Sequence, residues 1–242
     1  MVTKLVPISK VFANMKRMLV IIVKGMLAFK KILLVYLLVL LLSGSVYIAS
    51  TVYPDVNMSL AASRNTPWGI VTSIFAHSSL SHFGLNMGGL FIFALLFVFS
   101  NSTYSVQNKK RVERLTLFSV FVFAIISNVL WVILTPNPSV GASGLLYAVI
   151  GIVTGFSLFN GLQIVNFSKF KTQEAATVCV ILINMLLSIL LMAQVFQDPQ
   201  LFLNIGAGVN VIAHGVSYLL GLFVVFPYCL IAKISIMDTD RK

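Results

Sequence analysis

Histidine is scarce in this chain, and its three histidines, His77, His82 and His214, all lie within or at the edge of long apolar segments. Ionisable side chains are costly in hydrocarbon, so each of them is a candidate for chemistry. No Asp or Glu lies in the same segments. An imidazole without a carboxylate can still act as the general base for a hydroxyl or thiol nucleophile.

Two other hydrolytic chemistries do not fit these residues. A zinc hydrolase needs three protein ligands and a carboxylate base, but the chain has no HExxH motif. His77 and His82 would also lie about 140° apart around a helix. A dyad of carboxylates would need two buried acids, which the apolar segments lack. We therefore expect neither a metal nor a cofactor.

Ser143 is the best candidate nucleophile. It lies in the run Gly141-Ala142-Ser143-Gly144, directly after a turn with two prolines at 135–140. Small residues let the backbone bend sharply and let a substrate carbonyl come close. The apolar segment from Ser143 to Phe159 would give about 25 Å of helix, less than the roughly 30 Å of bilayer hydrocarbon. We therefore expect this span to begin below the membrane surface.

His214 is expected at the same depth as Ser143. It lies nine residues after Ile205, where we place the start of its span, which is about 13 Å along a helix. A base at this depth needs water, so we expect a wet cavity in the outer half of the protein. His82 and Asn86 are four residues apart and share a helical face, from which both can donate hydrogen bonds to an oxyanion.

The composition indicates that membrane helices position these residues. Of the 242 residues, 59% are apolar and 10% charged, and the mean hydropathy is +1.00. The uncharged stretch 115–168 is far longer than the roughly 20 residues that cross a bilayer, so it must fold back at 135–140. The predicted fold is an all-α, polytopic membrane protein with spans near 32–49, 79–99, 115–134, 143–159, 175–196 and 205–228.

The net charge of +11 indicates topology and not nucleic-acid binding. All 17 basic residues except Arg64 fall on one side of the predicted membrane domain, 31–232. The positive-inside rule then places both termini in the cytoplasm. Segment 1–30 is basic and fits either an amphipathic helix on the inner leaflet or a merely charged tail. A short cytoplasmic tail is expected at 233–242.

Taken together, the motifs resemble those of the rhomboid proteases. The Gly-x-Ser-Gly nucleophile motif of that family reads here Gly141-Ala142-Ser143-Gly144, and Tyr147 stands at the position of the tyrosine that packs beside the catalytic histidine. The pattern His-x4-His-x3-Asn reads His77, His82 and Asn86. The Ala-His of the last span reads Ala213-His214.

This resemblance implies a rhomboid-like bundle of six helices that acts as an intramembrane serine endopeptidase on transmembrane proteins, in a prokaryotic cell membrane. Ser143 would attack the scissile carbonyl and His214 would take its proton. His82, Asn86 and the amide of Ser143 would hold the oxyanion. Gly141, Gly144, Tyr147 and His77 would have supporting roles.

Two positions depart from the family pattern. Gly69 follows Trp68 where many members have arginine, which leaves open how the first outer loop is anchored. Ser217 stands in place of a common glycine, which would loosen packing between the fourth and sixth spans.

Two functions other than proteolysis would use some of the same residues. A rhomboid-like protein that only binds membrane clients would not need Ser143 and His214. A small transporter using His82, Asn86 and His214 as a polar path would be expected to show an internal repeat, and none is visible. His77, at the membrane edge, could equally have a loop-fixing role.

Overall fold

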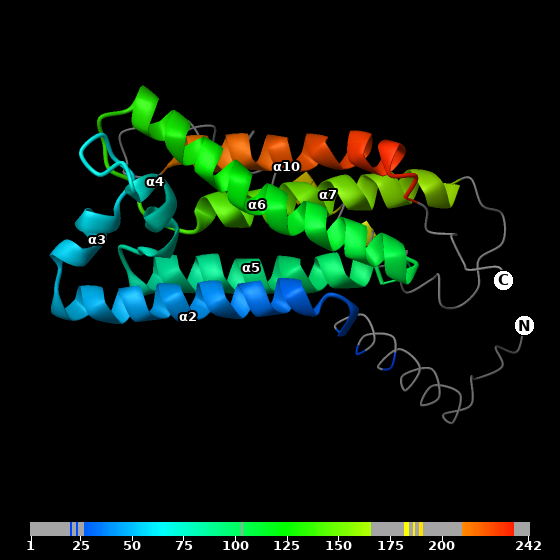
Figure 1. Cartoon of the computed structure of the whole chain (residues 1–242), viewed down its shortest axis with the longest axis horizontal. Helices are drawn as coiled ribbons and strands as arrows, with labels where there is room; N and C mark the ends of the chain where they lie inside the picture. Colours follow the sequence, from blue (N-terminus) through cyan, green and yellow to red (C-terminus); the bar gives the residue numbers. More distant parts are fainter. Residues whose placement is uncertain are drawn as a thin grey trace, which may run out of the picture.

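The computed structural model describes residues 27–102, 104–165 and 210–234, with single positions at 20, 23, 182, 183, 186, 189 and 190. Within these residues, five helices are long and apolar enough to cross a membrane. They are α2 (Lys30–Val52), α5 (Leu80–Ser100), α6 (Val106–Leu134), α7 (Ser143–Val165) and α10 (Val211–Ile231). Four of them, α2, α5, α7 and α10, have roughly parallel axes, and α6 crosses the bundle obliquely (Figure 1). The predicted all-α polytopic fold is confirmed.

Five of the six predicted spans correspond to these helices. The predicted span 175–196 lies outside the described residues except at its few single positions, as do nearly all of segment 1–30 and most of the tail 233–242. α6 starts at Val106, nine residues before the predicted 115, because its charged first turns continue the helix beyond the apolar stretch. Charges mark where the membrane ends, whereas capping residues mark where a helix ends.

Helix α7 is the central element of the bundle. Over an apolar stretch of 18 residues in α7, 72% of the residues are buried, compared with 17% over the same length in α2. Glycines bring α7 and α10 into backbone contact: a Cβ on Gly151 would lie 2.1 Å from the carbonyl oxygen of Tyr218, and one on Gly221 would lie 2.5 Å from that of Ala148. Such close approach is how helices pack without a hydrophobic driving force in lipid. The position of Ser143 at the start of α7 therefore depends on neighbours on several sides.

The segment 53–79, between α2 and α5, forms one end of the bundle, which we call the loop end. It contains α3 (Asp55–Leu60), α4 (Gly69–Thr72) and the 3-10 turn η1 (Ser73–Phe75). Arg64 anchors this segment, since its guanidinium donates to the last carbonyls of α6, those of Val132 and Ile133. Gly69 is required here because a Cβ would lie 1.8 Å from the carbonyl oxygen of Ala61.

The turn that precedes Ser143 is tied to the same end. Ala62 and Ser139 exchange two backbone hydrogen bonds, of 2.8 and 3.1 Å. The indole of the fully buried Trp131 donates to the carbonyl of Asn137 at 2.7 Å. The predicted fold-back at 135–140 is therefore an ordered connection between α6 and α7.

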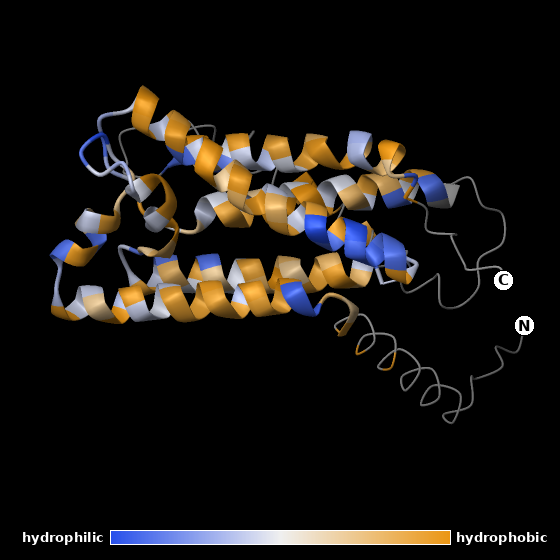
Figure 2. Cartoon of the chain, in the orientation of Figure 1, coloured by the Kyte–Doolittle hydropathy of each residue, from blue (hydrophilic) through white to orange (hydrophobic). Residues whose placement is uncertain are grey.

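The opposite end, which we call the basic end, holds the first residues of α2 and α6. Figure 2 shows hydrophilic residues gathered there, while the middle of the bundle is apolar. The amide of Lys31 donates to the buried carboxylate of Glu113, and Arg111 donates to the carbonyl of Ala232 just after α10. Three of the helices are therefore joined at this end by polar contacts.

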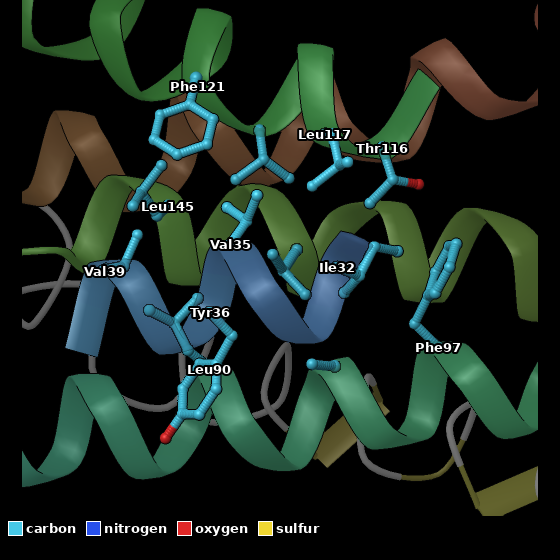
Figure 3. A pocket seen from close by; sticks show the side chains of 13 residues that line it. Ile32, Val35, Tyr36, Val39, Leu90, Phe97, Thr116, Leu117, Phe121 and Leu145 are labelled. Atoms are coloured by element: carbon cyan, nitrogen blue, oxygen red, sulfur yellow. The ribbon is translucent and has the colours of Figure 1, made fainter. Parts of the chain in front are cut away.

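Between the two ends, a small pocket of about 60 Å³ lies among α2, α5, α6 and α7. Figure 3 shows that its walls are almost entirely hydrocarbon, with Ile32, Val35, Leu90 and Leu117 among them. A buried water needs two to four polar partners, and apart from Tyr36 and Thr116 the lining residues have apolar side chains. Polar chemistry in this bundle must therefore take place elsewhere.

Candidate active site

A second, polar cavity of about 460 Å³ opens at the loop end. It is formed by the first turns of α5, α7 and α10 and by the turn before Ser143. The residues that line it are Ser78, His82, Leu85, Asn86, Pro138, Val140, Ser143, Leu146, Tyr147, Asn210 and His214. Five of the predicted site residues, from three helices, thus line one cavity: His82, Asn86, Ser143, Tyr147 and His214.

Ser143 is the first residue of α7 and reaches the cavity through the conformation of Gly141. Gly141 has φ +128, a value that side-chain-bearing residues rarely adopt. A Cβ there would lie 2.6 Å from Cε1 of His82 and 3.4 Å from Nδ2 of Asn86. The glycine therefore brings the backbone just before Ser143 directly against the His82 ring, and its own amide donates to the carbonyl of Ser73 at 2.8 Å.

At Gly144 the start of α7 packs closely against α6. A Cβ on Gly144 would lie 3.3 Å from Cα and Cβ of Ala124 and from Oγ of Ser127. These contacts are tighter than ordinary van der Waals contact, so a side chain at this position would require α6 or the start of α7 to shift slightly.

His214 is the fourth residue of α10. The helix begins at Val211 and not near Ile205, so His214 lies in the first turn, about 4.5 Å along the axis and not 13 Å. The expected distance of about 13 Å from the helix start is therefore wrong. Ser143 and His214 both lie at the starts of their helices, and their common depth in the membrane stays a prediction. The imidazole stacks on the ring of Tyr147, with centroids 4.2 Å apart and 16° between the planes.

Asn86 and His82 lie in the first two turns of α5. Asn86 is 4% exposed, and its Nδ2 has no hydrogen-bond partner among the described residues. Nδ1 of His82 is 3.3 Å from Oγ of Ser78. Asn86 lines the cavity, and a buried amide donor without a partner is costly until an acceptor reaches it.

His77 does not line the cavity but supports the turn beside it. It is fully buried, and its Nε2 accepts a hydrogen bond of 3.4 Å from the amide of Ala142, next to Ser143. Its Nδ1 lies 3.3 Å from the carbonyl of Phe75, which fits a proton on Nδ1. Burial, and secondarily the nearby His82, lower the pKa of His77 to about 4, so the ring is neutral at pH 7. These contacts favour the loop-fixing alternative for His77.

Ser217 does not lie loosely between the fourth and sixth spans. It is fully buried, and its hydroxyl lies 3.1 Å from Oγ of Ser127 and 3.3 Å from the carbonyl of Phe123, both on α6. The hydroxyl that replaces the glycine thus joins α10 to α6, on a different side from the glycine contacts with α7.

Sequence reasoning missed two buried polar residues of the site, Asn128 and Asn210. Asn210 lines the cavity and caps α10, and Asn128 lies behind it on α6. An amide within an uncharged apolar stretch is itself a signal, because a polar group in hydrocarbon needs a partner. Within the described ranges, no three His, Cys, Asp or Glu residues gather as a metal site would require.

Comparison with known families identifies one match. The family model described as Rhomboid domain matches residues 64–231, which is more than half of the chain. The matched range includes every site residue named above and leaves α2 outside. A comparison with curated proteins finds no match.

Proposed function

Because the chain belongs to the rhomboid family of intramembrane proteases, we propose that it is a serine endopeptidase with Ser143 as nucleophile and His214 as general base. Its substrates are transmembrane proteins, and the bond it cuts lies within or near the outer part of their spans. The observation that carries this proposal is the cavity at the loop end, which is lined by Ser143, His214 and Asn86, whose Nδ2 has no hydrogen-bond partner among the described residues.

In the first half of the reaction, Oγ of Ser143 attacks the scissile carbonyl carbon while His214 takes the hydroxyl proton. The tetrahedral intermediate collapses, the C–N bond breaks, and His214 gives the proton to the departing amine. In the second half, water attacks the acyl ester, His214 takes a proton from it and returns it to Oγ, and the new carboxylic acid leaves. A dyad suffices for these steps because the imidazole alternates between base and acid.

The tetrahedral intermediate carries a negative oxygen, and three donors are available for it. The Nδ2 of Asn86 is buried with no acceptor among the described residues. The amide of Ser143 is the first of helix α7, so it has no partner within the helix and lies at the positive end of the dipole. His82 can donate in the tautomer that carries its proton on Nε2. Donors placed in advance where charge develops contribute most to such reactions.

The cavity also supports the expected supply of water and the expected cleavage in the outer part of the substrate span. At about 460 Å³ it is large enough for many water molecules, and it lies at the loop end of the bundle. We place this end on the outer side because the described basic residues at the starts of α2 and α6 lie at the other end, and only Arg64 lies here. Both termini are then cytoplasmic, as expected in a prokaryotic cell membrane.

Proteolysis is tested by incubating the purified protein in detergent with a model transmembrane substrate and comparing wild type with Ser143→Ala. We expect cleavage by wild type only, at a bond in the outer half of the substrate span, and labelling of wild type only by a fluorophosphonate. A protein that binds clients without cutting them, or a transporter, would not be labelled. Equal cleavage by Ser143→Ala would contradict the proposal.

The orientation is tested with single cysteines in a background where Cys179 and Cys229 are replaced by Ala. Lys110 at the basic end and Asn65 at the loop end are both exposed. In intact cells an impermeant thiol reagent should label Asn65→Cys and leave Lys110→Cys unlabelled. The reverse pattern would show that the cavity opens to the cytoplasm.

A further inference from the structure

Two buried asparagines outside the proposed chemistry face each other next to the cavity. Asn128 is 5% exposed on α6, and Asn210 is 6% exposed at the start of α10. We propose that they are positioning residues, whose amides form a bridge that holds His214 in register with the turn carrying Ser143. This inference rests on the proposed function of that site.

On the α10 side, Asn210 controls where the helix begins. Its Oδ1 accepts a hydrogen bond of 2.8 Å from the amide of Ala213, and its backbone carbonyl accepts one of 3.3 Å from the amide of His214. The nitrogen of the same side chain makes a second contact: Nδ2 of Asn210 donates to Oδ1 of Asn128 at 3.4 Å. The cap of the helix that carries the base is thereby attached to α6.

On the other side, Asn128 continues the connection to the nucleophile turn. Its Nδ2 donates to Oγ of Ser73 at 3.1 Å and to the carbonyl of Ile70 at 2.9 Å. The carbonyl of Ser73 in turn accepts the amide of Gly141 at 2.8 Å. A continuous path of hydrogen bonds and short backbone steps thus runs from the residue next to His214 to the turn that ends in Ser143.

The chemistry of the bridge explains why both residues are asparagines. Asn210 must accept a hydrogen bond to cap α10 and donate one to α6, which needs a side chain with both an acceptor and a donor. Asn128 must likewise accept from Asn210 and donate to Ser73. If these residues served packing alone, an apolar side chain of similar volume would replace Asn128 at little cost. An amide bridge fixes the relative position of two elements that belong to different parts of the chain.

The test compares Asn128→Leu, which removes all the amide contacts, with Asn210→Ser, which keeps an oxygen for the cap but is too short to reach Asn128. We expect each to lower kcat by roughly ten- to hundredfold through misplacement, with little change in KM. The double variant should be no worse than the more severe single variant, because both break the same bridge.

A matched control is Asn160→Leu, since Asn160 is also fully buried and hydrogen-bonded, to Tyr104 and Ser100, at the other end of α7. It should lower the Tm and leave the kcat of the folded protein unchanged. Hydrogen exchange followed by mass spectrometry gives a readout that does not need activity. Exchange should accelerate in both 139–144 and 210–216 in the bridge variants, and in neither segment in the control.

The outcomes separate this inference from the proposed function. If wild type cleaves and the bridge variants keep its kcat and exchange pattern, the bridge is overturned and the protease stands. If wild type neither cleaves nor reacts with a fluorophosphonate, but exchange in the two segments is coupled as expected, the bridge stands and the protease is overturned. If Asn128→Leu does not fold, Asn210→Ser, with its cap intact, decides between these outcomes.

Discussion

The rings of Tyr147 on α7 and His214 on α10 are nearly parallel, 16° apart, with a centroid separation of 4.2 Å. Tyr147 lies one helical turn after Ser143, so the stack ties the orientation of the imidazole to the helix that carries the candidate nucleophile. The glycine contacts between α7 and α10 hold the two helices at the distance that such a stack requires.

Removal of the stacked ring should reduce turnover without abolishing it. Tyr147→Leu loses an interaction of about 0.5 to 1.5 kcal/mol that aligns His214, so we expect kcat to fall roughly two- to tenfold with KM little changed. Tyr147→Phe keeps the ring and should stay close to wild type. A loss as severe in Tyr147→Phe as in Tyr147→Leu would show that the hydroxyl, and not the stacking, matters.

Replacement of the base should have the largest effect at the site. An unassisted serine hydroxyl is a weak nucleophile at neutral pH, so His214→Ala should abolish both proteolysis and labelling of Ser143 by a fluorophosphonate. Unchanged melting in detergent would show that the variant is folded. Proteolysis retained by folded His214→Ala would rule out the dyad.

Asn86→Ala should instead leave a partly active enzyme. Loss of one oxyanion donor costs about 3 to 4 kcal/mol at most, which corresponds to a roughly 10²- to 10³-fold slower turnover. Slow labelling by the probe should remain, because Ser143 and His214 are intact. Since Nδ2 of Asn86 is already partnerless among the described residues, we expect the Tm not to fall. Full activity in Asn86→Ala would remove Asn86 from the oxyanion site.

Gly141→Ala should disrupt the turn before Ser143 for two separate reasons. Its φ of +128 is strained for alanine, and the new Cβ would lie 2.6 Å from the ring of His82. We expect kcat to fall by roughly a hundredfold, since the nucleophile and an oxyanion donor both move. Gly44→Ala on α2 is the control, because its Cβ would meet only Cζ of Phe83, at an ordinary 3.9 Å. Equal activity in the two variants would contradict this role for Gly141.

Acidification should destabilise the loop end through His77. Burial lowers the pKa of His77 to about 4, against about 6.5 in an unfolded chain. As pH falls, the imidazole of His77 is protonated in the unfolded chain before it is protonated in the folded protein. The free energy of unfolding is therefore highest above pH 6.5 and decreases as pH falls from 6.5 towards 4. Protonation would also remove the Nε2 acceptor for the amide of Ala142. His82, 5.2 Å away between ring centroids, is the neighbouring titratable group.

The measurement is the Tm of wild type and His77→Gln in detergent at pH 8 and at pH 5. Glutamine cannot titrate in this range, so its Tm should fall less on acidification than that of wild type. At pH 8 the variant should be the less stable of the two, because the fit of the imidazole is lost. Equal falls in Tm would place the pH dependence on other groups.

The amino-acid sequence by itself determined the membrane class and the place of five described spans, and it singled out five of the residues that line the cavity. Apolar runs with a few histidines and an asparagine are readable without a structure, because polar groups in hydrocarbon are rare and costly. The small residues around Ser143 and the pattern of His77, His82 and Asn86 pointed to one site. Of these residues, Ser143, His82 and Asn86 line the same cavity.

Only the tertiary structure decided which groups meet across helices. The start of α10 depends on the cap by Asn210, whose partner Asn128 is far away in sequence, so hydropathy placed the start six residues too early. Gly69 is explained by the backbone of Ala61 and Ser217 by the hydroxyl of Ser127. Hydropathy depends on the transfer energy of each residue by itself. These contacts depend on which helix lies beside which, and the pattern of apolar residues along the sequence does not specify that.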